Sequence, residues 1–273
     1  MPSTTTLLII DPQNDFCDIA GAALPVTGAN QDMLRLAAFI HRHQNRLDAI
    51  TATLDSHASV AVERTTFWMD ASGAAVAPFT FITEADVASG TYRPRRPEHT
   101  SKVLAMLQQL ALRGRAGLVV WPVHCVTGTG GHNIHSAVAD QLQAWEMAQQ
   151  KPVRKVLKGE YPLTEHFGVF EADAPDAAVP STLFNTALAQ EVSQGVDLLL
   201  IAGEASSHCV AASFDQLTRY LDQRSGPRPR IVLLSDCMSP VPGFEGLAEE
   251  FFQRAKAWGA EALRSDQAGQ SCW

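Results

Sequence analysis

Three residues that could cooperate in nucleophilic chemistry each follow a short apolar run of the sequence. They are Asp11, Lys158 and Cys209. Cys209 follows the stretch Gly203-Glu204-Ala205-Ser206-Ser207-His208, which is rich in small residues, and it opens a helix-like stretch. A helix N-terminus lowers the pKa of a cysteine, and its free backbone N–H groups can bind an oxyanion. This set therefore indicates attack by a thiolate on a carbonyl group. Taken alone, each residue could have an ordinary structural role. Asp11 could belong to a turn or helix cap, Lys158 could be solvated, and Cys209 could be a buried structural thiol.

A second group of polar residues is suited to binding a metal ion. Asp55 and His57 are two residues apart after another apolar run, so on an extended chain their side chains point the same way. His124 ends a third run and could supply a third ligand. One carboxylate and two imidazoles suit zinc, and manganese or iron if waters complete an octahedron. The glycines at 128–131 lack the ending of a phosphate-binding loop, which favours an ordinary tight turn.

The elements that must position these residues alternate along the chain. Apolar runs without polar alternation predict strands buried on both faces, and amphipathic stretches between them predict helices. This alternation predicts a doubly wound α/β fold: a mainly parallel six-stranded sheet with helices on both faces, and ligands bound at the carboxyl ends of the strands. The predicted strands are Leu7–Ile10, Ile50–Leu54, Gly117–Trp121, Val153–Leu157, Leu198–Ala202 and Ile231–Leu234. The predicted helices cover 30–46, 99–114, 132–150, 181–193, 208–224 and 246–263.

One segment interrupts this alternation. Residues 58–98 are rich in aromatic residues, Pro and Gly and show no clear period, so we expect an inserted loop region. Its aromatics, Trp68 among them, favour an ordered lid that contacts the substrate. A surface elaboration with no contact to the substrate is the alternative. We expect a single domain over residues 1–264 and a flexible tail over 265–273.

Composition narrows the class of protein. The 273 residues carry 21 Lys and Arg against 29 Asp and Glu, a formal charge of −8 without a basic block, which argues against nucleic-acid and membrane partners. No apolar run approaches the roughly 18 residues of a membrane helix, and we see no signal peptide. Five cysteines without a CxxC pair do not form a disulfide framework, and they predict a cytoplasmic protein.

The order of these motifs resembles the isochorismatase-like cysteine hydrolases, and the metal-type signature resembles their nicotinamidase branch. The motifs are Asp after the first strand, Asp-x-His, Trp-Pro-x-His-Cys, Lys-Gly and a helix-opening Cys. The resemblance implies a homo-oligomer and a bound divalent metal ion. It implies the catalytic triad Asp11, Lys158 and Cys209, the metal ligands Asp55, His57 and His124, the ring-stacking residue Phe16, a cis peptide at Glu204–Ala205, and oxyanion donors at the N–H groups of Ala205 and Cys209.

The chain also departs from that pattern. The stretch between His57 and His124 is longer than in compact nicotinamidases. His208 stands where an aromatic residue such as Tyr is common, and we expect it to contact the substrate. Glu63 stands where some relatives place an extra metal ligand. These departures affect the prediction of which substrate is bound more than the prediction of the reaction type.

The activity implied is hydrolysis of a small carboxamide, nicotinamide to nicotinate and ammonia, through a thioester. Asp11 would act as acid and then as base, so burial should raise its pKa and Lys158 should lower it. The alternatives are a related hydrolase of ureido or carbamoyl compounds, a hydrolase that uses metal-activated water, and a non-catalytic homologue.

Overall fold

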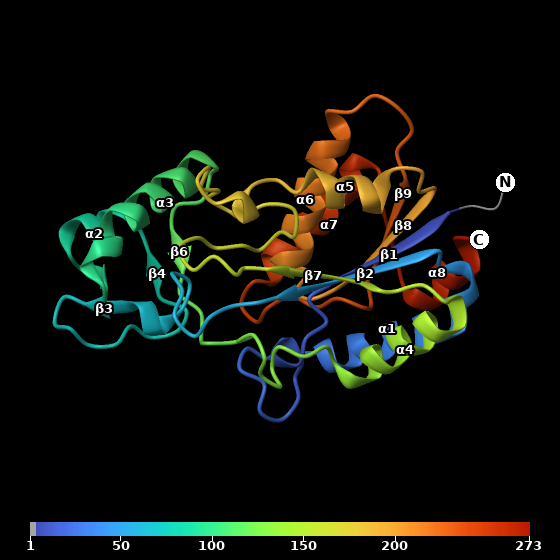
Figure 1. Cartoon of the computed structure of the whole chain (residues 1–273), viewed down its shortest axis with the longest axis horizontal. Coiled ribbons are helices and arrows are strands. Elements are labelled where there is room, and N and C mark those ends of the chain that lie inside the picture. Colours follow the sequence, from blue (N-terminus) through green and yellow to red (C-terminus); the bar gives the residue numbers. More distant parts are fainter. Residues whose placement is uncertain (1–3) are drawn as a thin grey trace.

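The computed structural model describes residues 4–273. Its centre is a sheet of six parallel strands in the order β10-β9-β8-β1-β2-β7 (Figure 1). The predicted α/β fold with a parallel six-stranded sheet is confirmed. The strands are β1 (Thr5–Ile10), β2 (Ala49–Asp55), β7 (Arg154–Lys158), β8 (Leu198–Gly203), β9 (Arg230–Leu234) and β10 (Glu261–Leu263).

Helices cover both faces of the sheet, because the central strands are apolar on both sides. In β1, Leu7 and Ile9 pack into one core with α1, α4 and α8, whereas Leu8 and Ile10 pack into another with α5, α6 and α7. Figure 1 shows α1, α4 and α8 on one side of the sheet and α5, α6 and α7 on the other. The helices are α1 (Ala29–His43), α4 (Ser136–Gln149), α5 (Thr186–Ser193), α6 (Cys209–Asp222), α7 (Glu245–Trp258) and α8 (Ser265–Ser271).

The prediction that Gly117–Trp121 forms a strand of the central sheet is wrong. Only β6 (Leu118–Val119) forms there, and it pairs antiparallel with β4 (Phe81–Ile82) outside that sheet. The sixth strand is β10, inside the predicted helix 246–263. The helix ends early because Gly259 adopts a left-handed conformation, with φ of 106°, and the chain then turns into β10.

The 58–98 segment is not a long loop but part of a second, smaller core. It contains β3 (Trp68–Asp70), β4, α2 (Glu84–Ser89) and β5 (Tyr92–Pro94), and α3 (Thr100–Leu112) follows it. Apolar residues of these elements pack together with those of β6. This unit lies at the end of the molecule remote from α8 (Figure 1). We call it the insertion and give it the bounds 58–119.

The predicted flexible tail is instead a packed helix. Ala268 of α8 is buried, and the Trp273 ring stacks on His43 with the ring centroids 5.0 Å apart. The Trp273 indole N–H also donates to Thr5 Oγ1 at 3.1 Å. A terminal aromatic ring gives this polar segment enough apolar area to pack. Within residues 4–273, no helix has the length and hydropathy needed to cross a membrane.

Candidate active site

The three proposed catalytic residues meet at the carboxyl edge of the sheet. Asp11 directly follows β1, Lys158 ends β7, and Cys209 is the first residue of α6, which follows β8. Strands β8, β1, β2 and β7 are consecutive parallel neighbours, so their carboxyl ends lie together. Strand order therefore brings together residues almost 200 positions apart in the sequence.

Lys158 is the centre of this group. Its Nζ lies 2.9 Å from Asp11 Oδ2 and 2.8 Å from Asp55 Oδ1. It also donates to the His166 carbonyl oxygen at 3.1 Å and lies 3.6 Å from Cys209 Sγ. The lysine side chain is 1% exposed, so these contacts replace water almost completely. One ammonium group thus contacts two carboxylates and the thiol.

Burial determines the protonation of these groups. It raises the pKa of Asp11, because its lowering by Lys158 is the smaller effect. For Lys158, burial alone would lower the pKa, but Asp11 and Asp55 raise it well above its ordinary value. Burial, together with Asp11 and Asp55, also raises the pKa of the Cys209 thiol, although Lys158 opposes this. These shifts favour a thiol rather than a helix-promoted thiolate at Cys209, beside the carboxyl group of Asp11.

The backbone before Cys209 has the arrangement expected of an oxyanion site. The Glu204–Ala205 peptide bond is cis, as the resemblance implies. Ala205 is buried, and no backbone carbonyl of the described residues accepts a hydrogen bond from its N–H or from that of Cys209. The Glu204 side chain points away and accepts from the Ser239 N–H at 3.1 Å. Two backbone donors therefore remain available next to the thiol.

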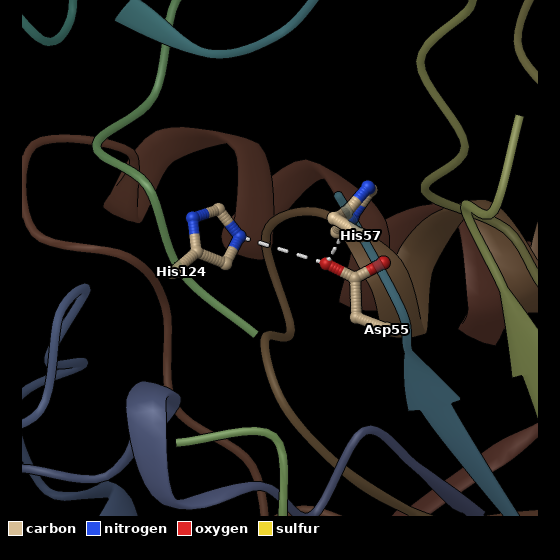
Figure 2. A group of neighbouring side chains, drawn as sticks. All are labelled: Asp55, His57 and His124. Carbon is tan, nitrogen blue, oxygen red and sulfur yellow. Dashed lines mark ion pairs between the residues drawn. The ribbon is translucent and has the colours of Figure 1, made fainter. Parts of the chain in front are cut away.

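Asp55, His57 and His124 converge beside this group (Figure 2). Asp55 Oδ2 lies 2.7 Å from His57 Nε2 and 3.5 Å from His124 Nε2. All three residues are buried, and their ligand atoms lie within 4.8 Å of one another. This donor set fits one divalent ion. Because Asp55 Oδ1 contacts Lys158, the same carboxylate joins the candidate metal ligands to the candidate catalytic residues.

Glu63 lies next to this centre, at the other nitrogen of the His57 ring. Its Oε1 lies 2.9 Å from His57 Nδ1, on the side of the ring away from Asp55. A carboxylate there favours a proton on Nδ1 and leaves Nε2 free to bind a metal. The two atoms are close enough for an ion pair but make no hydrogen bond of good geometry, so Glu63 is a candidate for orienting His57.

A pocket lies beside Cys209, with the metal ligands in its wall. The Phe16 ring lies 5.2 Å from that of His124 in an edge arrangement, and the His208 ring makes similar contacts with Trp121 and Phe167. Contrary to the prediction, the structure does not bring Trp68 to this pocket: it is buried in the core of the insertion and donates to Val62 O at 2.6 Å. Residues that line the pocket include Phe16, Trp121, His124, Phe167, His208 and Cys209.

Two pocket residues, Arg64 and Glu165, have no role in the sequence analysis. Both are buried and carry groups that usually ionise. Burial, with Glu63 and Asp173 nearby, raises the pKa of Glu165 to about 7. No motif signals either residue, because neither follows a strand of the sheet directly. The closest clue is the position of Glu165 in the loop after Lys158-Gly159.

Solved structures share the fold of this chain. The yeast nicotinamidase is 18% identical, with a TM-score of 0.64 over 95% of this chain and 99% of that one. A pyrazinamidase of Pyrococcus horikoshii in complex with zinc is also 18% identical, with a TM-score of 0.52 over 95% and 98%. An isochorismatase-like hydrolase from Alkaliphilus metalliredigens is 16% identical, with a TM-score of 0.54 over 99% and 100%. No protein-family model and no curated protein sequence matches this chain. At these identities the likeness shows the fold.

Proposed function

We propose that this protein is an amidase that hydrolyses a small carboxamide, with nicotinamide as the reference substrate and Cys209 as the nucleophile. The observation that carries the proposal is the buried contact of Lys158 with both Asp11 and Cys209. The neighbours that share the fold include a nicotinamidase and a pyrazinamidase, which supports an amide substrate.

The first step forms a thioester. Asp11 takes the proton of the Cys209 thiol as the sulfur attacks the amide carbon, and the Lys158 ammonium stabilises the negative charge. The carbonyl oxygen becomes an oxyanion next to the N–H groups of Ala205 and Cys209. Each such donor is worth roughly 2.7–4 kcal/mol in other enzymes. Asp11 then gives its proton to the departing nitrogen, and ammonia leaves.

The second step uses the same carboxyl group in the opposite direction. Asp11, now ionised, takes a proton from water, and the hydroxide attacks the thioester carbon. The C–S bond breaks, the acid departs and the thiol regains its proton. The raised pKa of Asp11 suits a group that must act as both acid and base.

Asp55, His57 and His124 would hold the divalent ion, and we propose zinc, with manganese or iron as the alternatives. Bound there, the ion would supply a Lewis acid that binds a ring nitrogen of the substrate or polarises bound water. The chain's own contribution is to orient these ligands through Glu63 and Lys158.

Ammonia release from nicotinamide tests the proposal, with Cys209→Ala as the variant and Cys237→Ala as the matched control. Cys237 is buried in the core on the α1 face and does not line the pocket. We expect Cys209→Ala to lose roughly 10⁴-fold or more in kcat with its fold intact, and the control to retain activity. Ammonia release by Cys209→Ala near the wild-type rate would contradict the thiol mechanism and favour a metal-dependent hydrolase.

A further inference from the structure

The mechanism leaves two buried polar side chains of the pocket without a role. Arg64 is 0% exposed and lines the same pocket as Cys209. Its Nη1 donates to Pro122 O at 3.2 Å and also contacts the His124 ring, 3.0 Å from Nε2, and its Nε lies 3.4 Å from Glu63 Oε1. Its Nη2 has no hydrogen-bond partner among the described residues. A buried guanidinium N–H without an acceptor is costly, so a ligand that offers an acceptor would be favoured here.

Glu165 offers the opposite chemistry. Its Oε2 accepts from the Trp121 indole N–H at 3.1 Å, and its Oε1 accepts from the His166 N–H at 3.0 Å. A carboxylate can accept about four hydrogen bonds, so each oxygen retains a free acceptor site. The side chain lines the pocket and is 3% exposed. A hydrogen-bond donor on a bound ligand could therefore bind to the free acceptor sites of Glu165.

Trp121 holds both groups in the same wall. Its backbone pairs with that of Arg64 in a short parallel bridge, while its indole N–H binds Glu165. Trp121 itself is 3% exposed and packs edge-on against His208, next to Cys209. This wall is therefore fixed by packing and hydrogen bonds in the protein alone.

We propose that Arg64 and Glu165 form a polar subsite that binds an acceptor and a donor on the ring of the substrate. Building on the proposed function, this assigns the substrate class: carboxamides whose ring carries a carbonyl or anionic oxygen beside an N–H, as in a lactam. Plain nicotinamide has a ring nitrogen acceptor and no ring donor, so it cannot use the acceptor sites that Glu165 retains beside its bonds to Trp121 and His166. A site built for hydrogen bonds discriminates strongly against a ligand that lacks them.

Relative kcat/KM for 2-hydroxynicotinamide, 6-hydroxynicotinamide and nicotinamide tests this subsite. Both hydroxy compounds exist largely as lactams, and together they present the polar edge on either side of the ring. We expect one of them to exceed nicotinamide by about tenfold or more in the wild-type enzyme. A wild-type enzyme that favours nicotinamide, or does not distinguish the three, overturns the subsite.

Variants of Arg64 and Glu165 test whether these residues cause the preference for a lactam over nicotinamide. Arg64→Met and Glu165→Leu should bring the ratio of the favoured lactam to nicotinamide near one. Arg64→Lys and Glu165→Gln, which disturb the packing less, should reduce it in part. Arg230→Met is the control, because Arg230 pairs with Glu261 at the surface, and it should keep the wild-type ratio. A ratio unchanged in all four pocket variants contradicts the proposal.

A binding measurement separates this inference from the proposed function. If the wild-type enzyme releases ammonia from none of the three amides, the proposed function fails, and calorimetry on Cys209→Ala with 2- and 6-hydroxynicotinate and nicotinate then decides the subsite. Preferential binding of a hydroxy acid that is lost in Cys209→Ala/Arg64→Met supports it. Equal affinity for the three acids overturns it.

Discussion

The two walls of the pocket are built in different ways. One wall lies at the edge of the sheet, where Cys209 and Asp55 line the pocket. Lys158 contacts both of them and Asp11 from the ends of the neighbouring strands. The other includes Arg64, Trp121 and Glu165, which lie outside the strands of the sheet. The first holds the groups that would break a bond. The second holds groups that would choose which molecule is presented to them.

The comparison indicates that strand order places the groups proposed to react, whereas irregular segments place the groups proposed to select the substrate. The strand-end groups lie where any doubly wound sheet gathers its ligands. The other wall depends on single contacts, such as the Trp121 indole with Glu165 at 3.1 Å. Loops that carry such contacts vary more readily than the sheet that supports them. Chains with this fold can therefore keep the groups at the strand ends and differ in the loops around the pocket.

The largest expected effect is a loss of folding stability when a residue at the sheet edge is changed. Lys158→Met leaves the carboxylates of Asp11 and Asp55 buried without their cation, and removing one partner of a buried pair costs about 3–5 kcal/mol. Lys102→Met is the matched control: Lys102 also lies 2.9 Å from a carboxylate, that of Asp176, but its side chain is 50% exposed. We expect the control to lose less than about 1 kcal/mol in urea unfolding.

Comparable losses in the two lysine variants would contradict the buried arrangement. A second variant sharpens the test. Asp11→Asn added to Lys158→Met removes one of the two stranded charges, so it should recover part of the lost stability. No recovery would mean that Asp11 does not interact with Lys158 in the folded protein.

The sheet-edge wall could be predicted from the sequence because position in a strand determines where a side chain points. Asp11, Asp55 and Lys158 were assigned from the apolar runs before them and from the order of the motifs, and the structure places them within contact of one another. Burial, however, reverses the expected effect on Cys209. A sequence shows that a cysteine opens a helix, but not how much water the folded chain excludes from it.

The other wall could not be predicted in this way. Trp68 lies in the insertion that the sequence indicates, yet its ring turns into that unit's own core, while Trp121 turns to the pocket. No motif marks Arg64 or Glu165, and charged residues seldom lie inside a protein, so nothing in the sequence places them in a buried wall. The short strand β10 was missed for a similar reason: it pairs only through its neighbour β9, and nothing local distinguishes it from the end of a helix.

The next effect is a pH dependence of folding stability that comes from Glu165, in the wall that also contains Arg64 and Trp121. The pKa of Glu165 is about 7 in the folded protein, against an ordinary 4.5. Between these values the folded state holds a proton that the unfolded state has released, so stability falls as pH rises from about 4.5 to about 7. The full loss is about 3 kcal/mol. Glu165→Gln removes this dependence.

Urea unfolding of the wild type and of Glu165→Gln at several pH values from 4 to 8 measures the effect. Relative to the wild type, the variant should gain stability steadily as pH rises through that interval. Parallel pH profiles for the two proteins would show that Glu165 is not buried as the structure places it.

A smaller effect is expected where the two walls meet, at the metal ligands. Glu63→Gln weakens the contact that orients His57, and loss of such a contact costs roughly 10–100-fold in metal affinity. Glu165→Gln is the control, because Glu165 lines the same pocket but contacts none of the three ligands. Zinc affinity is measured by competition with a chromogenic chelator. Equal zinc affinity in the wild type and in Glu63→Gln would show that Glu63 does not contribute to metal binding.

The smallest effect on activity is expected at Trp68, and it separates the core of the insertion from the pocket wall. Trp68→Phe removes the indole N–H that donates to Val62 O, so it should cost about 1 kcal/mol of stability. Because Trp68 does not line the pocket, KM should stay within about twofold of wild type. Trp121→Phe removes the equivalent N–H from Glu165 and should alter KM and selectivity. If instead Trp68→Phe changes KM and Trp121→Phe does not, the insertion closes over the substrate as a lid, and the selective wall lies there.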